Sequence, residues 1–383
     1  MTPSLRWDLF CRVVDNYGDG GVCWRLARQL ASEHGLVVTL WIDDVASLAR
    51  IEPALDPRRD YQVARSVRVR TFTPSHPAQY LEPDVVIEGF GCGLPDDYRD
   101  AMAVAPRRPV WVNLEYLSAE GWVESAHALP SPHPRLPLNR WFYFPGFTTA
   151  TGGLLREAGL EAAPSAFRRD AAQRQALWHS LGVQPAEPGL TVSLFCYANA
   201  ALPALLDVWA EGDEAIVCVV PEGVAQSELD RWTGGAIPHP GMPVVRGRLT
   251  LAVAKFVVQD AFDHRLWACD LNFVRGEDSL VRALWAMQPL VWQIYPQAED
   301  VHLLKLDALL ARCEADMDAG AARAQRAFWH AWNRGDPEAT AAAWPAFREA
   351  LPRLRVRGSE WAQALARQSD LAKGLVTFCE TRL

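Results

Sequence analysis

The sequence predicts an α/β protein with two facing Rossmann-like domains, an interdomain cleft and a C-terminal helical tail. Short apolar runs alternate with segments of helical periodicity in the first half of the chain. The same pattern restarts after a Pro- and Gly-rich linker at residues 184–189, and the chain from residue 321 onward is helix-like. Short apolar runs separated by helices are typical of parallel strands that are buried on both faces. A chain of 383 residues also exceeds one ordinary hydrophobic core, so two domains are expected.

The first domain is predicted to span residues 1–184. Its expected strands are the apolar runs at residues 7–14, 36–42, 84–87 and 109–114. The helical spacing of Val22, Leu26 and Leu30 predicts a helix directly after the first strand. Residues 118–160 break the pattern with several prolines and aromatic side chains. This stretch is typical of a long loop, and it is a candidate for docking a partner.

The second domain is predicted to span residues 190–350, and a helical tail at residues 351–383 is expected to pack back on the first domain. The expected strands are residues 190–197, 215–220, 242–249, 271–274 and 290–294. A helix is expected at residues 171–181, and the helical region near the end should break near Gly335 and Pro352. In open parallel sheets, ligands bind beyond the carboxyl ends of the strands, so the site is expected there.

The composition argues against several classes of function. A net charge of −8 and a pI near 5.6 weigh against a nucleic-acid partner. No apolar run reaches the roughly 18–20 residues that a membrane-spanning helix requires, and the first residues lack the pattern of a signal peptide. The eight cysteines are scattered without metal-ligand spacing, which suits reduced, buried thiols. A cytoplasmic protein is therefore expected.

The most informative segment is residues 272–279, with the sequence NFVRGEDS. It follows an apolar run and opens a helix-like segment at residues 280–287. A helix N-terminus presents unpaired N–H groups to an anion, and Arg275 adds a planar cationic fork. Glu277 and Asp278 would repel a bare phosphate. A ligand that carries both phosphate and sugar hydroxyls reconciles these charges, so we expect a nucleotide-sugar.

A second informative segment is the turn at residues 15–21, DNYGDGG, between the first predicted strand and helix. A Gly-rich turn at this place usually cradles a dinucleotide phosphate, but Cys23 occupies the position of the motif's third glycine. Two aspartates in the turn would also repel a pyrophosphate. We therefore expect Asp15 and Asp19 to project into the cleft, with Asp19 as the candidate general base and Asp15 as its companion. A plain turn with N-capping aspartates is the alternative.

Three clusters of aromatic and polar residues lie at or near predicted element ends, at residues 193–197, 259–263 and 295–300. Aromatic rings can stack on a nucleotide base, and a glutamine can bond to the edge of the base. For each single aromatic residue, core packing is the alternative. The clusters together favour a base-binding surface.

The sequence DMD at residues 316–318 has the form of a motif that holds a divalent ion in some nucleotide-sugar enzymes. It lies within the helix-like stretch 303–326, where residues i and i+2 do not share a face. We expect a solvated helix face at this place and no metal site.

Five segments resemble the EarP family of bacterial protein-arginine rhamnosyltransferases, namely residues 15–19, 113–118, 193–197, 272–279 and 294–297. They are spread over nearly the whole chain, and the string at 272–279 is highly specific. The resemblance implies a GT-B fold and an inverting, metal-independent transfer of rhamnose from dTDP-β-L-rhamnose, without a cofactor. The acceptor would be one arginine of translation elongation factor P, bound by the N-terminal domain, while the C-terminal domain would bind the nucleotide-sugar.

The resemblance also implies roles for single residues. Asp19 would be the general base, Asp15 its essential companion, and Glu277 would serve the sugar or the catalysis. Phe195 and Phe262 would flank the thymine of the donor, and Gln259 and Tyr295 would help to hold its nucleotide. The diphosphate would be held by Tyr197, Arg275, Asp278 and Ser279.

Two places depart from the family's pattern. Gly20 stands where an aliphatic residue is expected, and His264 with Arg265 replaces a more apolar pair. Neither change removes a proposed functional group, so only the fine geometry of the loops is in question.

Three other functions remain open from the sequence. One is a GT-B glycosyltransferase that acts on a small molecule or a glycan. Another is an NAD-dependent oxidoreductase, because Asp43 follows the glycine turn at roughly the spacing of a ribose-binding acid. The missing third glycine and the two turn aspartates argue against it. The last is a non-catalytic binding module.

Overall fold

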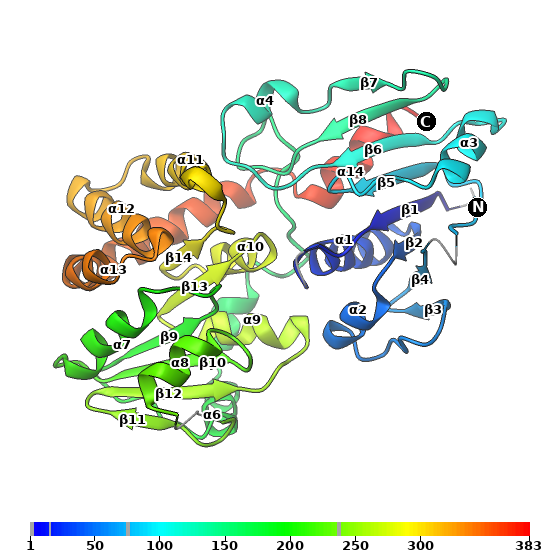
Figure 1. Cartoon of the computed structure of the whole chain (residues 1–383). Coiled ribbons are helices and arrows are strands. Elements are labelled where there is room, and N and C mark those ends of the chain that lie inside the picture. The colour runs from blue at the N-terminus through cyan, green and yellow to red at the C-terminus, as the bar shows by residue number, and fades with distance from the viewer. Residues whose placement is uncertain (1–3, 15–16, 74–76, 236–238) are drawn as a thin grey trace. The chain divides into compact units, whose positions relative to one another are not determined.

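The computed structural model describes residues 4–14, 17–73, 77–235 and 239–383, and the chain forms two compact units (Figure 1). Unit 1 consists of Met1–Ala158 together with Leu365–Leu383, and unit 2 consists of Gly159–Ala364. Each unit contains its own largely parallel sheet, as the alternation of apolar runs and helices predicts. Among the described residues, no helix is both long enough and apolar enough to span a bilayer.

The sheet of unit 1 has eight strands in the order β3-β4-β2-β1-β5-β6-β8-β7. Its strands are β1 (Arg6–Cys11), β2 (Val37–Ile42), β3 (Tyr61–Ala64), β4 (Val67–Thr71), β5 (Val85–Gly89), β6 (Val110–Leu114), β7 (Pro130–Pro132) and β8 (Asn139–Tyr143). The inner strands pair in parallel, and β3 and β7 add antiparallel edges. The four predicted runs correspond to β1, β2, β5 and β6, which are buried along nearly their whole length.

The helices of unit 1 are α1 (Gly18–His34), α2 (Val45–Ile51), α3 (Asp96–Val104), α4 (Trp122–Ala126) and α14 (Leu371–Glu380). Helix α1 contacts β1 and β2, and α14 contacts α1, so the last helix of the chain is part of unit 1 (Figure 1). Phe10, Trp41 and Tyr98 belong to one buried aromatic cluster. Asp8 accepts hydrogen bonds from the Tyr98 hydroxyl (2.6 Å) and the Trp41 indole (2.9 Å). These bonds satisfy the Asp8 carboxylate, whose pKa is raised by burial.

Residues 118–160 are more regular than the sequence suggests. They contain α4, β7 and β8, and β8 extends the sheet by pairing in parallel with β6. Pro130 and Pro132 lie in the edge strand β7, where a missing N–H removes no essential ladder hydrogen bond. The prediction of one long loop is therefore wrong for the strands at its centre.

The sheet of unit 2 has six strands in the order β11-β12-β10-β9-β13-β14. They are β9 (Leu190–Leu194), β10 (Ile216–Pro221), β11 (Val244–Arg246), β12 (Leu249–Ala254), β13 (Leu271–Arg275) and β14 (Leu290–Gln293). All pairings are parallel except that of the edge strand β11 with β12. The single strand predicted at residues 242–249 is wrong, because a turn at Gly247 and Arg248 reverses the chain between β11 and β12.

Unit 2 has more residues in helices than in strands. The helices are α5 (Ala163–Arg169), α6 (Ala171–Ser180), α7 (Leu202–Glu211), α8 (Gln226–Thr233), α9 (Gln259–Ala268), α10 (Asp278–Trp285), the short η1 (Ala298–Asp300), α11 (His302–Glu314), α12 (Ala319–Arg334) and α13 (Pro337–Ala366). The predicted break at Gly335 is present between α12 and α13. The break predicted near Pro352 is wrong, since α13 continues through it. Close packing supports the helix before this proline, because Phe347 stacks on Phe328 of α12 at 4.4 Å between ring centroids.

The boundary between the units lies earlier in the chain than predicted. The sequence assigns residues 159–184 to the first domain, but α5 and α6 belong to unit 2. Phe167 of α5 packs edge-to-face on Trp267 of α9, with 5.9 Å between ring centroids. Leu181 shares a buried cluster with Val219 of β10. Apolar packing onto the second sheet therefore decides where this segment belongs, and the tail joins unit 1 only from Leu365.

Cys23 and Gly89 let α1 approach the sheet of unit 1 closely. Gly89 is the last residue of β5, and a Cβ atom at this position would lie 2.8 Å from the Phe10 carbonyl oxygen and 3.1 Å from Cys23 Sγ. Cys23 is fully buried. The close helix–strand packing that the third glycine provides in dinucleotide-binding folds is achieved here by a small thiol on the helix and a glycine on the strand.

We expect Gly89→Ala to lower the free energy of unfolding by about 1–3 kcal/mol, because the new methyl group meets backbone that cannot move away. Gly20→Ala is the matched control, since its methyl group would find only ordinary contacts at 3.7 and 3.8 Å. The control should be neutral, or more stable by up to about 1 kcal/mol, because glycine weakens helices. Urea unfolding followed by circular dichroism measures both, and equal midpoints for the two variants would contradict the packing argument.

Candidate active site

The turn between β13 and α10 carries Arg275, Asp278 and Ser279, three of the residues that the sequence predicts to bind a nucleotide-sugar. Strand β13 ends at Arg275, Gly276 adopts the left-handed conformation with φ 62°, and α10 begins at Asp278. The Trp292 indole of β14 donates a hydrogen bond of 2.8 Å to the Gly276 carbonyl, which fixes the turn. The first-turn N–H groups of α10 therefore lie at the carboxyl edge of the sheet, where an anion can bind them.

The Arg275 guanidinium lies between two aromatic rings. Its central carbon is 4.4 Å from the centroid of the Phe195 ring and 4.7 Å from that of Tyr197. Nη1 donates a hydrogen bond of 2.9 Å to the Cys196 carbonyl. Contact with two rings and a carbonyl fixes the plane of the guanidinium, and its five N–H donors exceed what one carbonyl needs. The arrangement suits the binding of a further anion.

The Ser279 side chain holds the turn together. Its hydroxyl accepts a hydrogen bond of 3.1 Å from the Arg275 backbone N–H and donates a short one to the Arg275 carbonyl. Because the hydroxyl proton is used within the turn, the group that Ser279 offers a ligand is its backbone N–H in the first helical turn. Its contact with a diphosphate stays a prediction.

A buried ion pair joins α9 and α10, the helices that carry the predicted residues Gln259, Phe262 and Asp278. Arg282 of α10 and Asp263 of α9 form two hydrogen bonds of 2.7 and 3.2 Å, and their side chains are only 4% and 5% exposed. At the start of the same helices, Gln259 donates a hydrogen bond of 3.1 Å to the Asp278 carboxylate. The pair thereby holds Gln259 and Asp278, both predicted donor-binding residues, in contact.

The predicted aromatic residues form one continuous row around Arg275. Phe262 packs edge-to-face on Phe195 at 5.4 Å between centroids, and Tyr295 does the same with Tyr197 at 5.4 Å. A base that is flanked by two parallel rings needs about 7 Å between those rings. The Phe195 and Phe262 rings are in direct contact and leave no such gap. A base would therefore contact both rings from a shared side, unless one ring turns away.

Two further groups complete this edge of unit 2. The Tyr197 backbone N–H donates a 3.0 Å hydrogen bond to Gln293 Oε1 at the end of β14, which holds the loop after β9 against the sheet. Gln293 was not predicted as a site residue, although it directly precedes the 294–297 segment. Glu277 is half-buried at the N-cap position of α10, where a carboxylate interacts favourably with the helix dipole.

In unit 1, Asp19 lies in the first turn of α1 and is 4% exposed. Its Oδ2 accepts a hydrogen bond of 2.9 Å from the Val14 N–H, and the Tyr116 hydroxyl lies 3.5 Å from Oδ1. Asp15, its predicted companion, lies outside the described residues. The carboxylate of Asp19 is therefore held at the carboxyl end of β1 and is largely buried, and its projection into a cleft as a base stays a prediction.

Tyr116 lies beside Asp19 in unit 1, and it belongs to a group of four side chains for which no role was predicted, although three of them lie in the 113–118 segment. Tyr116 follows β6 and stacks on Phe90, which follows β5, at 4.5 Å between centroids. Between them, Asn113 donates to the Glu115 carboxylate at 2.5 Å, and burial raises the pKa of Glu115. All four residues lie at or just beyond the carboxyl ends of neighbouring strands, and this position was the signal that could have identified them.

Asp43, the residue that would bind the ribose in an oxidoreductase, accepts a hydrogen bond from within the fold. Its Oδ1 accepts a hydrogen bond of 2.9 Å from the Val13 N–H, so it ties the end of β1 to the end of β2. This bond uses one oxygen of the Asp43 carboxylate within the fold, which weakens the case for a ribose-binding acid at this place.

The chain matches the family model described as "Elongation-Factor P (EF-P) rhamnosyltransferase EarP" over residues 7–380. It is 46% identical to a protein-arginine rhamnosyltransferase of Pseudomonas putida over 380 residues, which cover 98% of this chain and 99% of the relative. A solved structure that concerns EarP-mediated arginine glycosylation of translation elongation factor EF-P is similar over 99% of both chains, with 35% identity and a TM-score of 0.70.

The chain belongs to the EarP family. The fold is GT-B, with two parallel α/β units and a C-terminal helix, as the resemblance implies. A more distant similarity, to MurG of Acinetobacter baumannii with 13% identity and a TM-score of 0.54, covers 99% of this chain and 100% of MurG and supports the fold alone.

The two departures from the EarP family's pattern are accommodated by packing in helices. His264 stacks on Phe167 of α5 at 5.1 Å. Arg265 is buried with its guanidinium 5.7 Å from the centroid of the Phe262 ring, and burial lowers its pKa to about 10. Gly20 lies within α1, where the surrounding space would accept a methyl group. All three residues therefore lie in helices and not in loops.

The DMD segment lies in a turn rather than in a helix, so its predicted location is wrong. It separates α11 from α12, Asp316 has a φ of 63°, and the Asp318 carboxylate caps α12 by accepting from the Gly320 and Ala321 N–H groups. The α-helical spacing of the flanking residues concealed this break. Within the described ranges, no group of three or more His, Cys, Asp or Glu side chains is placed to hold a metal ion.

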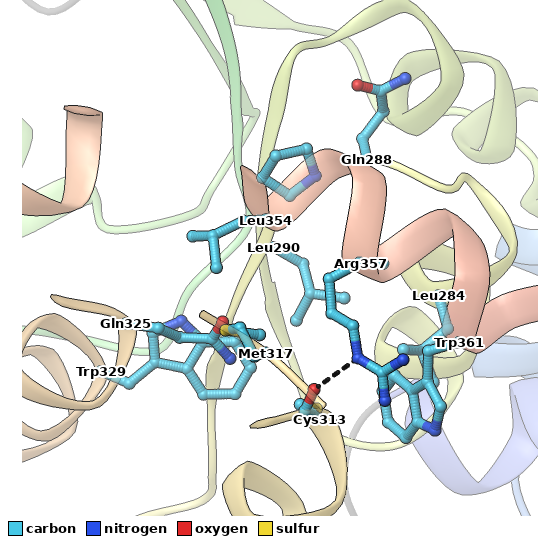
Figure 2. A pocket seen from close by; sticks show the side chains of 12 residues that line it. Leu284, Gln288, Leu290, Cys313, Met317, Gln325, Trp329, Leu354, Arg357 and Trp361 are labelled. Atoms are coloured by element: carbon cyan, nitrogen blue, oxygen red, sulfur yellow. Dashed lines mark hydrogen bonds between the residues drawn. The ribbon is translucent and has the colours of Figure 1, made fainter. Parts of the chain in front are cut away.

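A small cavity in unit 2 lies among α10, α11, α12 and α13 (Figure 2). Its walls include Leu284, Trp329 and Trp361, and Arg357 donates a hydrogen bond of 3.3 Å to the Cys313 carbonyl beside it. About 40 Å³ is available inside, which is room for a few water molecules and not for a nucleotide. None of the predicted site residues lines it.

We expect Asp263→Leu to destabilise unit 2 by about 3–5 kcal/mol, because it leaves the Arg282 charge buried without its partner. The double variant Asp263→Leu with Arg282→Met should recover a large part of that loss, since it removes both charges. Thermal unfolding of the two variants and the parent measures the effect. Losses that simply add would show that the two side chains are not energetically coupled.

Proposed function

We propose that this chain transfers rhamnose from dTDP-β-L-rhamnose to one arginine side chain of elongation factor P, with inversion at the anomeric carbon. The observation that carries this proposal is the fixed Arg275 at the start of α10, in a chain that matches the EarP family from residue 7 to 380. The eight free cysteines, most of them buried, support a location in the reducing cytoplasm.

In this proposal, unit 2 binds the donor. The diphosphate would lie against Arg275 and the first-turn N–H groups of α10, which stabilise the negative charge that develops on the leaving group. The thymine would lie on the ring surface of Phe195 and Phe262. The carboxylates of Glu277 and Asp278 would accept hydrogen bonds from hydroxyl groups of the sugar or the ribose. Cationic and helix N-terminal groups together can stabilise the leaving diphosphate without a metal.

Unit 1 would bind and activate the acceptor arginine. A free arginine is a poor nucleophile, because its pKa lies above ~12 and its nitrogen lone pairs are delocalised. Asp19 and Asp15 would pair with the guanidinium and localise its charge. The Asp19 carboxylate would then accept one proton while the arginine nitrogen forms its bond to the sugar.

The transfer would occur in a single displacement. The arginine nitrogen attacks the anomeric carbon from the face opposite the diphosphate, and the bond from that carbon to the diphosphate oxygen breaks. The leaving dTDP takes the bonding electron pair, and Asp19 takes the proton. A base and a leaving group on opposite faces give inversion.

We expect Asp19→Asn to lower kcat at least about 100-fold, because an amide cannot accept the arginine proton. The fold should remain, since the asparagine oxygen can still accept from the Val14 N–H. Binding of dTDP, measured by calorimetry, should not change, because the proposed donor residues lie in unit 2. Turnover at the parent rate would refute the assignment of Asp19 as the base.

Mass spectrometry of elongation factor P after incubation with the enzyme and dTDP-β-L-rhamnose should show the addition of one deoxyhexose on an arginine. The same reaction with dTDP-glucose tests the sugar, and elongation factor P with that arginine changed to lysine tests the acceptor. Both controls should remain unmodified. No mass shift with intact protein and donor, together with transfer to a small glycan acceptor, would favour the alternative glycosyltransferase.

A further inference from the structure

The chain passes between the two units twice. The place where it leaves unit 1 lies next to the place where it returns. The chain leaves unit 1 after Ala158 and returns at Leu365. The segments on the unit 1 side of these crossings contact each other. Leu371 donates its N–H to the Leu154 carbonyl at 2.9 Å. The Arg156 guanidinium donates to the carbonyls of Ala366 and Gln368, where α13 ends. Arg156 therefore ties the outgoing segment to the returning one.

Helix α1 binds these segments with three residues along one face. Arg25, Gln29 and Glu33 are spaced i, i+4 and i+8, so they project from the same side of the helix. Arg25 pairs with Glu157 at 3.3 Å, and Glu33 accepts a hydrogen bond of 2.8 Å from the Ala158 N–H. We call these three residues the α1 stripe.

Gln29 is the central member of the α1 stripe and contacts both crossings. Its amide donates to the Arg156 carbonyl at 2.9 Å and to the Asp370 carboxylate at 3.2 Å. Gln29 and Arg25 are each only 1% exposed. Polar groups buried this deeply strongly favour the one geometry that provides their partners, because leaving such a group unsatisfied costs about 1–3 kcal/mol.

The same helix carries Asp19 in its first turn. Gln29 lies ten residues further along α1, which corresponds to about 15 Å of regular helix. Residues of one regular helix keep fixed positions relative to one another, so contacts at the stripe also fix the position of the Asp19 carboxylate.

We propose that the α1 stripe is a positioning device for the transfer reaction: it fastens both chain crossings to the helix that carries the base. The inference rests on the proposed function, because it gives Asp19 the role of the base. Arg25, Gln29 and Arg156 are positioning residues in this scheme. They hold the base at a fixed place relative to the two points at which the chain passes between the units.

Gln29→Met and Arg156→Met test the proposal in the full-length enzyme. Each variant keeps a long side chain and removes the hydrogen bonds to the crossings. We expect kcat to fall roughly 10- to 100-fold, as small misplacements of reacting groups do, while the affinity for dTDP stays unchanged. Leu30→Ala is the matched control, since Leu30 is buried in the same helix but is not part of the stripe. It should lower the melting temperature and leave kcat unchanged at temperatures where the protein is folded.

Parent-like kcat in both Gln29→Met and Arg156→Met would overturn the proposal. An equal loss of kcat in Leu30→Ala would also overturn it, because the effect would then come from instability of the helix. If Gln29→Met fails to fold, Arg156→Met decides, since Arg156 is only half-buried and its loss should be tolerated. Arg25→Lys keeps the charge opposite Glu157 and should retain more activity than Arg25→Met.

A second measurement does not depend on the reaction. Spin labels at the exposed positions 104 of unit 1 and 245 of unit 2 report the distribution of distances between the units in the full chain. Gln29→Met should broaden this distribution relative to the parent and to Leu30→Ala. An unchanged distribution would overturn the fastening by the stripe, whereas a broadened one with no transfer activity in the parent would point to failure of the proposed function alone.

Discussion

The candidate donor-binding surface of unit 2 depends on the buried ion pair between Asp263 and Arg282. Two charged groups that are 4% and 5% exposed are stable only when they face each other with good geometry. This requirement fixes the register of α9 against α10. Gln259 at the start of α9 and Asp278 at the start of α10 then meet, and Phe262 reaches the Phe195 ring. One ion pair therefore determines how residues from two helices and one loop share a surface.

Arg275 shows how the site can provide positive charge without flexibility. A free arginine side chain has many rotamers and loses entropy when it binds a ligand. Here two aromatic faces and the Cys196 carbonyl fix its plane in advance. A fixed cation next to the N-terminus of α10 gives a preorganised electrostatic environment, in which little rearrangement is needed as charge develops on a leaving group.

Much of the fold could be predicted because buried parallel strands are apolar along their whole length. The runs that correspond to β1, β2, β5 and β6 are of this kind. Strand β7 could not be recognised, because Pro130 and Pro132 resemble loop residues and only their edge position makes them compatible with a sheet. The continuation of α13 through Pro352 and the assignment of α5 and α6 to unit 2 depend on packing with Phe328, Trp267 and Val219, which no local pattern contains.

The candidate site was predictable where local sequence and local structure coincide. The NFVRGEDS string joins a strand, a glycine turn and a helix start within eight residues, and Arg275, Asp278 and Ser279 lie there as expected. Tyr116 lies in the 113–118 segment, but neither its contact with Phe90 nor its place beside Asp19 could be predicted from that local string. Their contact depends on the order β5-β6 in the sheet, which is a property of the topology.

Unit 1 is built from two separate stretches of chain, which affects the order in which the units can fold during synthesis. Unit 2 is continuous and is complete on the ribosome once residue 364 has emerged. Unit 1 is translated first but needs α14, at residues 371–380, and α14 packs on α1. The first 158 residues of the nascent chain must therefore wait, with part of their apolar surface uncovered, until α14 has emerged. Domains usually fold in the order in which they are made, whereas here the unit that is translated first is the last to be completed.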